Sequence, residues 1–111
     1  FPAANEQVSI YLEESGFSVK NDLCLQCKSW TDIAKVDKKV MLSSLQKLDD
    51  DNIDALIQVG TNLPMASFAE EFEKSFQKPI IPINTATYWD ALRQNDIPDK
   101  VKGFGKLLSE Y

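Results

Sequence analysis

The stretch Asp54-Ala55-Leu56-Ile57-Gln58-Val59-Gly60-Thr61-Asn62-Leu63-Pro64-Met65 decides the fold, because an apolar run stops abruptly on small polar residues. Residues 55–59 alternate little, which is typical of a strand covered on both faces, at the centre of a sheet. Pro64 is tolerated in a first helical turn. The apolar residues that follow at helical spacing predict a buried helical stripe: Met65, Phe68, Ala69, Phe72 and Phe76.

The rest of the chain continues this alternation of helix and strand. Apolar spacing predicts helices over residues 2–15 and 37–50, and a short last helix over 104–111. Residues 17–25 suit a strand near one edge of the sheet, and residues 78–83 suit a short buried strand with irregular or edge pairing at Pro82. Asn84 or Thr85 is suited to cap a further helix that turns Tyr88, Trp89 and Leu92 inward.

This order of elements predicts an α/β fold. We expect residues 1–111 to form a single domain of three layers, in which a short parallel sheet is flanked by helices, because each crossover helix returns the chain to the same end of the sheet.

Composition excludes several classes of function. The 111 residues carry a net charge of −5 and no stripe of Lys or Arg, so we expect no nucleic-acid partner. No apolar run is long enough to cross a bilayer, so we expect no membrane partner and a cytoplasmic location. The sequence contains no histidine, which excludes Ser-His-Asp and Cys-His catalysis and histidine-ligated zinc within this chain. Because residue 1 is Phe rather than Met, we expect a chain that was processed, trimmed or taken from a longer one.

Polar residues follow two successive predicted strands. Gly60, Thr61 and Asn62 follow the first, and Asn84 and Thr85 follow the second. At the carboxyl ends of parallel strands, such residues and the free N–H groups of the next helix suit a bound carboxylate. The alternative is that they are ordinary turn and cap residues.

Two longer stretches resemble a known family: Asp54 to Pro64, and Glu73-Lys-Ser-Phe-Gln-Lys-Pro-Ile-Ile-Pro-Ile-Asn-Thr-Ala-Thr-Tyr-Trp-Asp-Ala-Leu-Arg93. Together with Thr31-Asp-Ile-Ala34 and Gly103-Phe-Gly105, they resemble the C-terminal half of the aspartate/glutamate racemase superfamily. The branch that the chain resembles is that of arylmalonate decarboxylase and maleate cis-trans isomerase.

The resemblance implies an enzyme of two similar α/β halves with the active site between them. It implies a small carboxylic or dicarboxylic acid as substrate, no metal and no organic cofactor. One cysteine from each half would face the substrate, to move a proton or to add to an alkene.

The sequence departs from this pattern in two ways. Gly60 stands where the racemase and isomerase members have the cysteine of a Cys-Thr-Asn motif, so we expect no catalytic residue in this chain. The other half is absent, as is the strand that precedes Phe1 in the family, and its absence should leave a hole in the sheet. We therefore expect a homo-oligomer or a partner to a missing N-terminal half. An intact parent would be an enzyme, whereas this chain alone would be a non-catalytic, self-associating module with a residual carboxylate pocket.

Two further features have open interpretations. Cys24 and Cys27 form a C-x-x-C, which suits a redox pair or half of a zinc site. Unpaired reduced thiols are favoured, because no other ligands complete a zinc site and because a redox pair normally opens a helix, whereas this one ends a predicted strand. Phe1 matches a position where relatives have a substrate-binding Tyr. Trp30 follows the second predicted element and suits either substrate contact or core packing.

Overall fold

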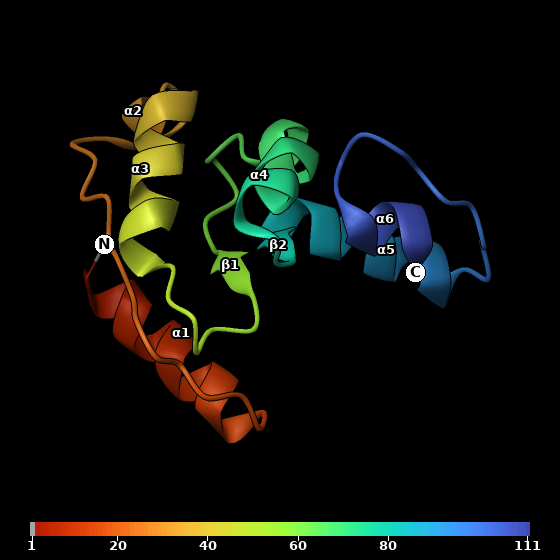
Figure 1. The fold of residues 1–111 in the computed structure, drawn as a ribbon, viewed down its shortest axis with the longest axis horizontal. Helices are drawn as coiled ribbons and strands as arrows, with labels where there is room; N and C mark the ends of the chain where they lie inside the picture. The colour runs from red at the N-terminus through yellow and green to blue at the C-terminus, as the bar shows by residue number, and fades with distance from the viewer. Residues whose placement is uncertain (1) are drawn as a thin grey trace.

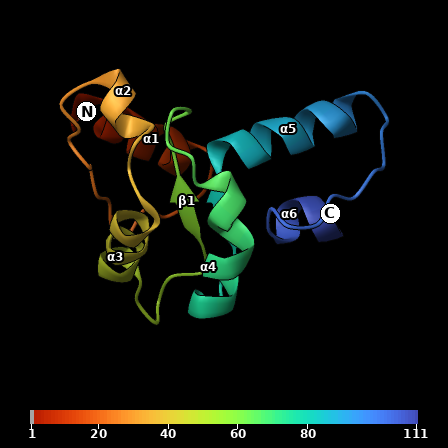
Figure 2. The ribbon, with the colours of Figure 1, turned by 90° about the horizontal axis from the view of Figure 1, so that it is seen from above.

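The backbone alternates helices with two short strands. The computed structural model describes residues 2–111. Its elements are α1 (Pro2–Glu14), α2 (Trp30–Ile33), α3 (Lys38–Leu48), β1 (Leu56–Gln58), η1 (Ala66–Phe68), α4 (Ala69–Phe76), β2 (Ile80–Pro82), α5 (Ile83–Gln94) and α6 (Lys106–Glu110). Figures 1 and 2 show α1 and α3 on one side of β1, with α5 and α6 on the other.

The two strands form a parallel sheet. Leu56 pairs with Ile80 and Gln58 pairs with Pro82, and α4 lies between the strands in the chain. The α4 crossover returns the chain to the same end of the sheet, as parallel pairing requires. The predicted α/β fold with a short parallel sheet flanked by helices is confirmed.

The prediction that residues 55–59 are covered on both faces is wrong. Leu56 and Gln58 are buried, but the side chain of Ile57, which points to the opposite face, is 44% exposed, and Val59 is 49% exposed. The core packs against the face that carries Leu56, whereas Ile57 on the opposite face lies outside the core cluster. The prediction of a central position is also wrong, because β2 is the only strand beside β1 among residues 2–111.

The predicted strand at residues 17–25 is also absent. This segment has no regular secondary structure, and residues 18–28 form no backbone–backbone hydrogen bond within residues 2–111. A strand exists only where a neighbouring strand supplies the hydrogen-bonding partners. The apolar pattern of this segment therefore has nothing to pair with in the described chain.

The helices lie where the apolar periodicity predicts them, but several of them begin or end at other residues than predicted. Asp37 caps α3 by accepting a hydrogen bond from Val40 N at 2.9 Å. The helical stretch after β1 begins at Ala66, not at Pro64. The prediction that Asn84 or Thr85 caps α5 is wrong, because β2 runs directly into the helix and Pro82 occupies the cap position.

One hydrophobic core joins α3, the sheet and α4. It contains Met41, Leu45, Leu56, Leu63, Met65, Ala69, Phe72 and Ile80. The predicted inward stripe of α5 is confirmed at Leu92 but wrong at Tyr88, which is 53% exposed. The core packs α3 and α4 against the strands, and the polar residues of the candidate site follow directly after these strands.

Candidate functional site

The turn after β1 holds the first group of predicted site residues. The backbone of Gly60 has a φ of +130°. L side chains rarely adopt such a conformation, and so any residue other than glycine would be strained there. Gln58 Nε2 donates a hydrogen bond to the Gly60 carbonyl oxygen at 2.7 Å, and Leu63 N donates to the same oxygen at 3.2 Å. These two bonds hold the turn against the end of the strand.

The ends of the two strands are tied to each other. Asn84, in the first turn of α5, donates from Nδ2 to the Thr61 carbonyl oxygen at 2.9 Å. Gly60, Thr61, Asn62 and Asn84 all lie at or near the surface, outside the buried core. The structure therefore brings these four residues together, as the parallel pairing predicts.

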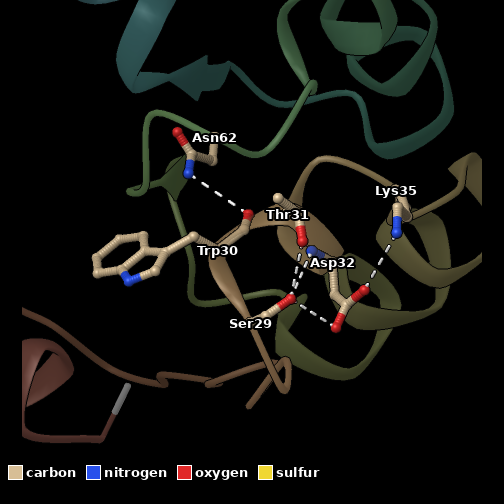
Figure 3. A network of polar contacts seen from close by, with 6 residues as sticks. All are labelled: Ser29, Trp30, Thr31, Asp32, Lys35 and Asn62. Atoms are coloured by element: carbon tan, nitrogen blue, oxygen red, sulfur yellow. Dashed lines mark hydrogen bonds and ion pairs between the residues drawn. The ribbon is translucent and has the colours of Figure 1, made fainter.

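Trp30 adjoins the same turn (Figure 3). Asn62 Nδ2 lies 3.5 Å from the carbonyl oxygen of Trp30, to which it donates. The indole of Trp30 is not packed in the core, since the residue is 67% exposed. Two roles were predicted for Trp30, substrate contact and core packing. Core packing is wrong, and substrate contact stays a prediction.

A capping network that the sequence analysis missed fixes the position of Trp30. The Ser29 side chain accepts a hydrogen bond from Asp32 N at 3.2 Å and donates to the Asp32 carboxylate at 2.7 Å (Figure 3). Lys35 lies 3.5 Å from the same carboxylate. An acidic residue three positions after a serine cap resembles the recognised capping box, so the sequence carried the signal for this network.

Thr85 differs from the other predicted site residues. It is 3% exposed, and its Oγ1 has no hydrogen-bond partner among residues 2–111. Gln58 Oε1 and Trp89 Nε1 are likewise buried without a partner within the described residues. Thr85 is thus adjacent in sequence to Asn84 but does not lie at the surface with Gly60, Thr61, Asn62 and Asn84. The remaining predicted site residue, Phe1, lies outside the described residues.

A cavity of about 550 Å³ opens beside the turn. Its lining includes Gly60, Trp30 and both cysteines. Cys24 and Cys27 are free thiols that are partly buried.

Among residues 2–111 no group of three or more His, Cys, Asp or Glu side chains is arranged to hold a metal ion. No helix of this part of the chain is long and apolar enough to span a bilayer.

Comparisons with known proteins agree on one family. The family model described as arylmalonate decarboxylase matches residues 2–108. A maleate isomerase from Nocardia farcinica is 29% identical over 106 residues, which are 95% of this chain and 42% of that protein.

Solved structures of two maleate isomerases share the fold. The Nocardia farcinica maleate cis-trans isomerase bound to TRIS matches with a TM-score of 0.92 at 27% identity, over 99% of this chain and 45% of that one. The maleate isomerase Iso from Pseudomonas putida S16 matches with a TM-score of 0.91 at 25% identity, again over 99% and 45%. The chain therefore spans less than half the length of the relatives that it matches.

Proposed function

Because the chain belongs to the arylmalonate decarboxylase family and corresponds to the C-terminal half of a maleate isomerase, we propose that it is the acid-binding domain of an isomerase- or decarboxylase-like enzyme. Its substrate would be a small carboxylic or dicarboxylic acid. The observation that supports this best is the link between the two strand ends, where Asn84 bonds to the main chain of Thr61.

The chemistry of these residues suits a carboxylate. The Thr61 hydroxyl and the second amide hydrogens of Asn62 and Asn84 are donors at one surface patch, and a carboxylate accepts several such bonds. The first turn of α5, which has no side-chain cap, adds the N–H groups of a helix N-terminus and the positive end of the helix dipole. Trp30 would cover the apolar part of the acid. Thr85 would take part only after a movement that uncovers its hydroxyl.

Catalysis would require a thiol that this chain lacks at the strand end. One Nocardia farcinica maleate isomerase structure carries a covalently bound succinylcysteine intermediate. A thiolate that adds across the double bond of maleate gives this adduct: the C–S bond forms, the π electrons move to the neighbouring carbon, and that carbon takes a proton. Gly60 has no side chain to supply sulfur, and neither Cys24 nor Cys27 matches the position of the family's catalytic cysteine. The attacking cysteine would therefore come from outside residues 1–111. The chain alone would bind the acid without converting it, and no metal or organic cofactor would be needed.

Titration calorimetry with malonate, maleate and aspartate tests the proposal. Thr61→Ala and Asn62→Ala should each weaken binding about three- to tenfold, because each removes a hydrogen bond worth about 0.5–1.5 kcal/mol. The matched control is Asn95→Ala, since Asn95 is also exposed and donates from Nδ2 to a backbone carbonyl, that of Ala91 at 2.8 Å. Equal affinities in all three variants would remove the proposed pocket.

A second candidate function is a non-catalytic module that associates with itself. The apolar edge of β1, with Ile57 and Val59 about half exposed, favours it, because unpaired strand edges promote association. Sedimentation equilibrium of the chain would then show a dimer or larger oligomer. A monomer at all concentrations would exclude this candidate.

A further inference from the structure

Tyr88 is an exposed aromatic residue on the same face of α5 as Asn84. Residues four apart in a helix lie one above the other on one face, with their Cβ atoms about 5–6 Å apart. Tyr88 is 53% exposed, and its hydroxyl forms no hydrogen bond within residues 2–111. Helix α5 therefore carries a ring and a free hydroxyl at the surface, one turn away from Asn84.

Helix geometry directs the ring of Tyr88 toward the acid site, by which we mean the surface group of Gly60, Thr61, Asn62 and Asn84. Long side chains of a helix point back toward its N-terminus and cover the preceding turn. For Tyr88 that turn is the first turn of α5, which holds Asn84. Because Asn84 Nδ2 donates to Thr61 O at 2.9 Å, this turn lies against the end of β1. Tyr88 therefore borders the acid site on the side of Asn84.

The hydrogen-bond donors around the acid site form two groups. The Thr61 hydroxyl and the Asn62 amide belong to the turn after β1, whereas the second amide hydrogen of Asn84 and the Tyr88 hydroxyl belong to α5. A single carboxylate can be bound by the first group alone. Malonate and maleate carry two carboxylates on the same or on adjacent carbons, so such an acid presents a second carboxylate beside the first. Only an acid of this kind uses both groups of donors.

We propose that Tyr88 is a specificity-determining residue of the acid site. Its hydroxyl, together with the second amide hydrogen of Asn84, binds the second carboxylate of a dicarboxylic acid. A phenol donates one hydrogen bond, and a bond to a charged acceptor is stronger than one to a neutral acceptor. The site thereby favours a dicarboxylic acid over a monocarboxylic acid of the same shape. This inference rests on the proposed acid-binding function.

Removing only the hydroxyl of Tyr88 tests the proposal. Tyr88→Phe keeps the ring, and Tyr11→Phe is the matched control, because Tyr11 is also exposed and lies on α1, away from the acid site. The two ligands are maleate and isocrotonate, in which a methyl group replaces one carboxylate of maleate. Calorimetry would measure the affinity for maleate, and NMR titration would measure the affinity for the more weakly bound isocrotonate.

The two ligands should respond differently to the loss of the hydroxyl. Tyr88→Phe should weaken maleate binding about three- to tenfold, as expected for the loss of one hydrogen bond, and should change isocrotonate binding less than about twofold. Tyr11→Phe should change neither affinity. A hydroxyl that only supported the fold would affect both ligands equally, so the ratio of the two affinities reports on specificity itself.

Three results would overturn the proposal, and they separate its failure from that of the proposed function. If the parent binds maleate and Tyr88→Phe binds it equally well, the hydroxyl takes no part, although the acid site stands. If Tyr88→Phe weakens the binding of maleate and isocrotonate by the same factor, the hydroxyl does not select dicarboxylic acids. If the parent binds neither ligand, the proposed acid-binding function is wrong and this inference fails with it.

Discussion

Placing a side chain at Gly60 should destabilise the protein through the backbone alone. The residue has a φ of +130°. Non-glycine residues held in such regions cost about 1–3 kcal/mol. Space does not add to this cost, since a Cβ at residue 60 would lie 3.6 Å from Gln58 Nε2, an ordinary contact distance. Gly60→Ala and Gly60→Cys should therefore each lower the free energy of unfolding by about 1–3 kcal/mol. At about 4 °C per kcal/mol for a domain of this size, Tm should fall by about 4–12 °C.

Thermal and urea unfolding followed by circular dichroism would measure both variants. Thr61→Ala is the matched control, because it changes the next residue of the same turn without requiring a positive φ. The control should stay within about 0.5 kcal/mol of the parent, as exposed substitutions usually do. A Gly60→Ala protein as stable as the control would refute the reasoning. It would mean that the turn accepts an ordinary backbone conformation, and that glycine is not needed there to keep the two strand ends in place.

Two further predictions concern carboxylates that stabilise the fold away from the site. The buried Glu73 carboxylate accepts hydrogen bonds from Lys106 N at 2.9 Å and from Ile80 N at 3.3 Å. Glu73→Gln should therefore cost about 1.5–3 kcal/mol in urea unfolding. A loss below about 0.5 kcal/mol, the usual range of exposed substitutions, would contradict this role. At Asp50, the Asn52 backbone N–H and then its side-chain amide donate to the carboxylate and lower its pKa below the ordinary 3.8. A lowered folded-state pKa contributes stability that is present above pH 3.8 and is lost as the pH falls through the folded-state value. Tm should consequently fall less in acid for Asp50→Asn than for the parent, and parallel Tm curves would argue against it.

Local patterns predicted the parts of the fold that depend on near neighbours in sequence. The periodicity of residues 37–50 gives α3, and the two apolar runs give β1 and β2 in parallel register. The juxtaposition of Thr61 and Asn84 followed from that register, because parallel strands bring their carboxyl ends to one edge.

The remaining features depend on partners that a local pattern does not reveal. Residues 17–25 have the composition of a strand, but whether they form one depends on a neighbour that residues 2–111 lack. Burial of Ile57 was overestimated because an apolar run does not show whether an element packs on each face of the strand. Thr85 and Asn84 are adjacent in sequence, yet helix geometry turns one into the interior and leaves the other nearer the surface. Nothing in the spacing of the charged residues of α4 distinguished Glu73, whose burial depends on the distant start of α6.

Mapping maleate on the chain by NMR tests the central claim most directly. In a ¹⁵N-labelled sample titrated with maleate, the amide signals of Gly60, Thr61, Asn62 and Asn84 should shift together along one saturable binding curve. The amide of Asn95, at the far end of α5, should stay in place and serves as the reference. If maleate leaves the four amides unmoved, or shifts them no more than Asn95, the joined strand ends are a structural turn and the acid-binding account is wrong.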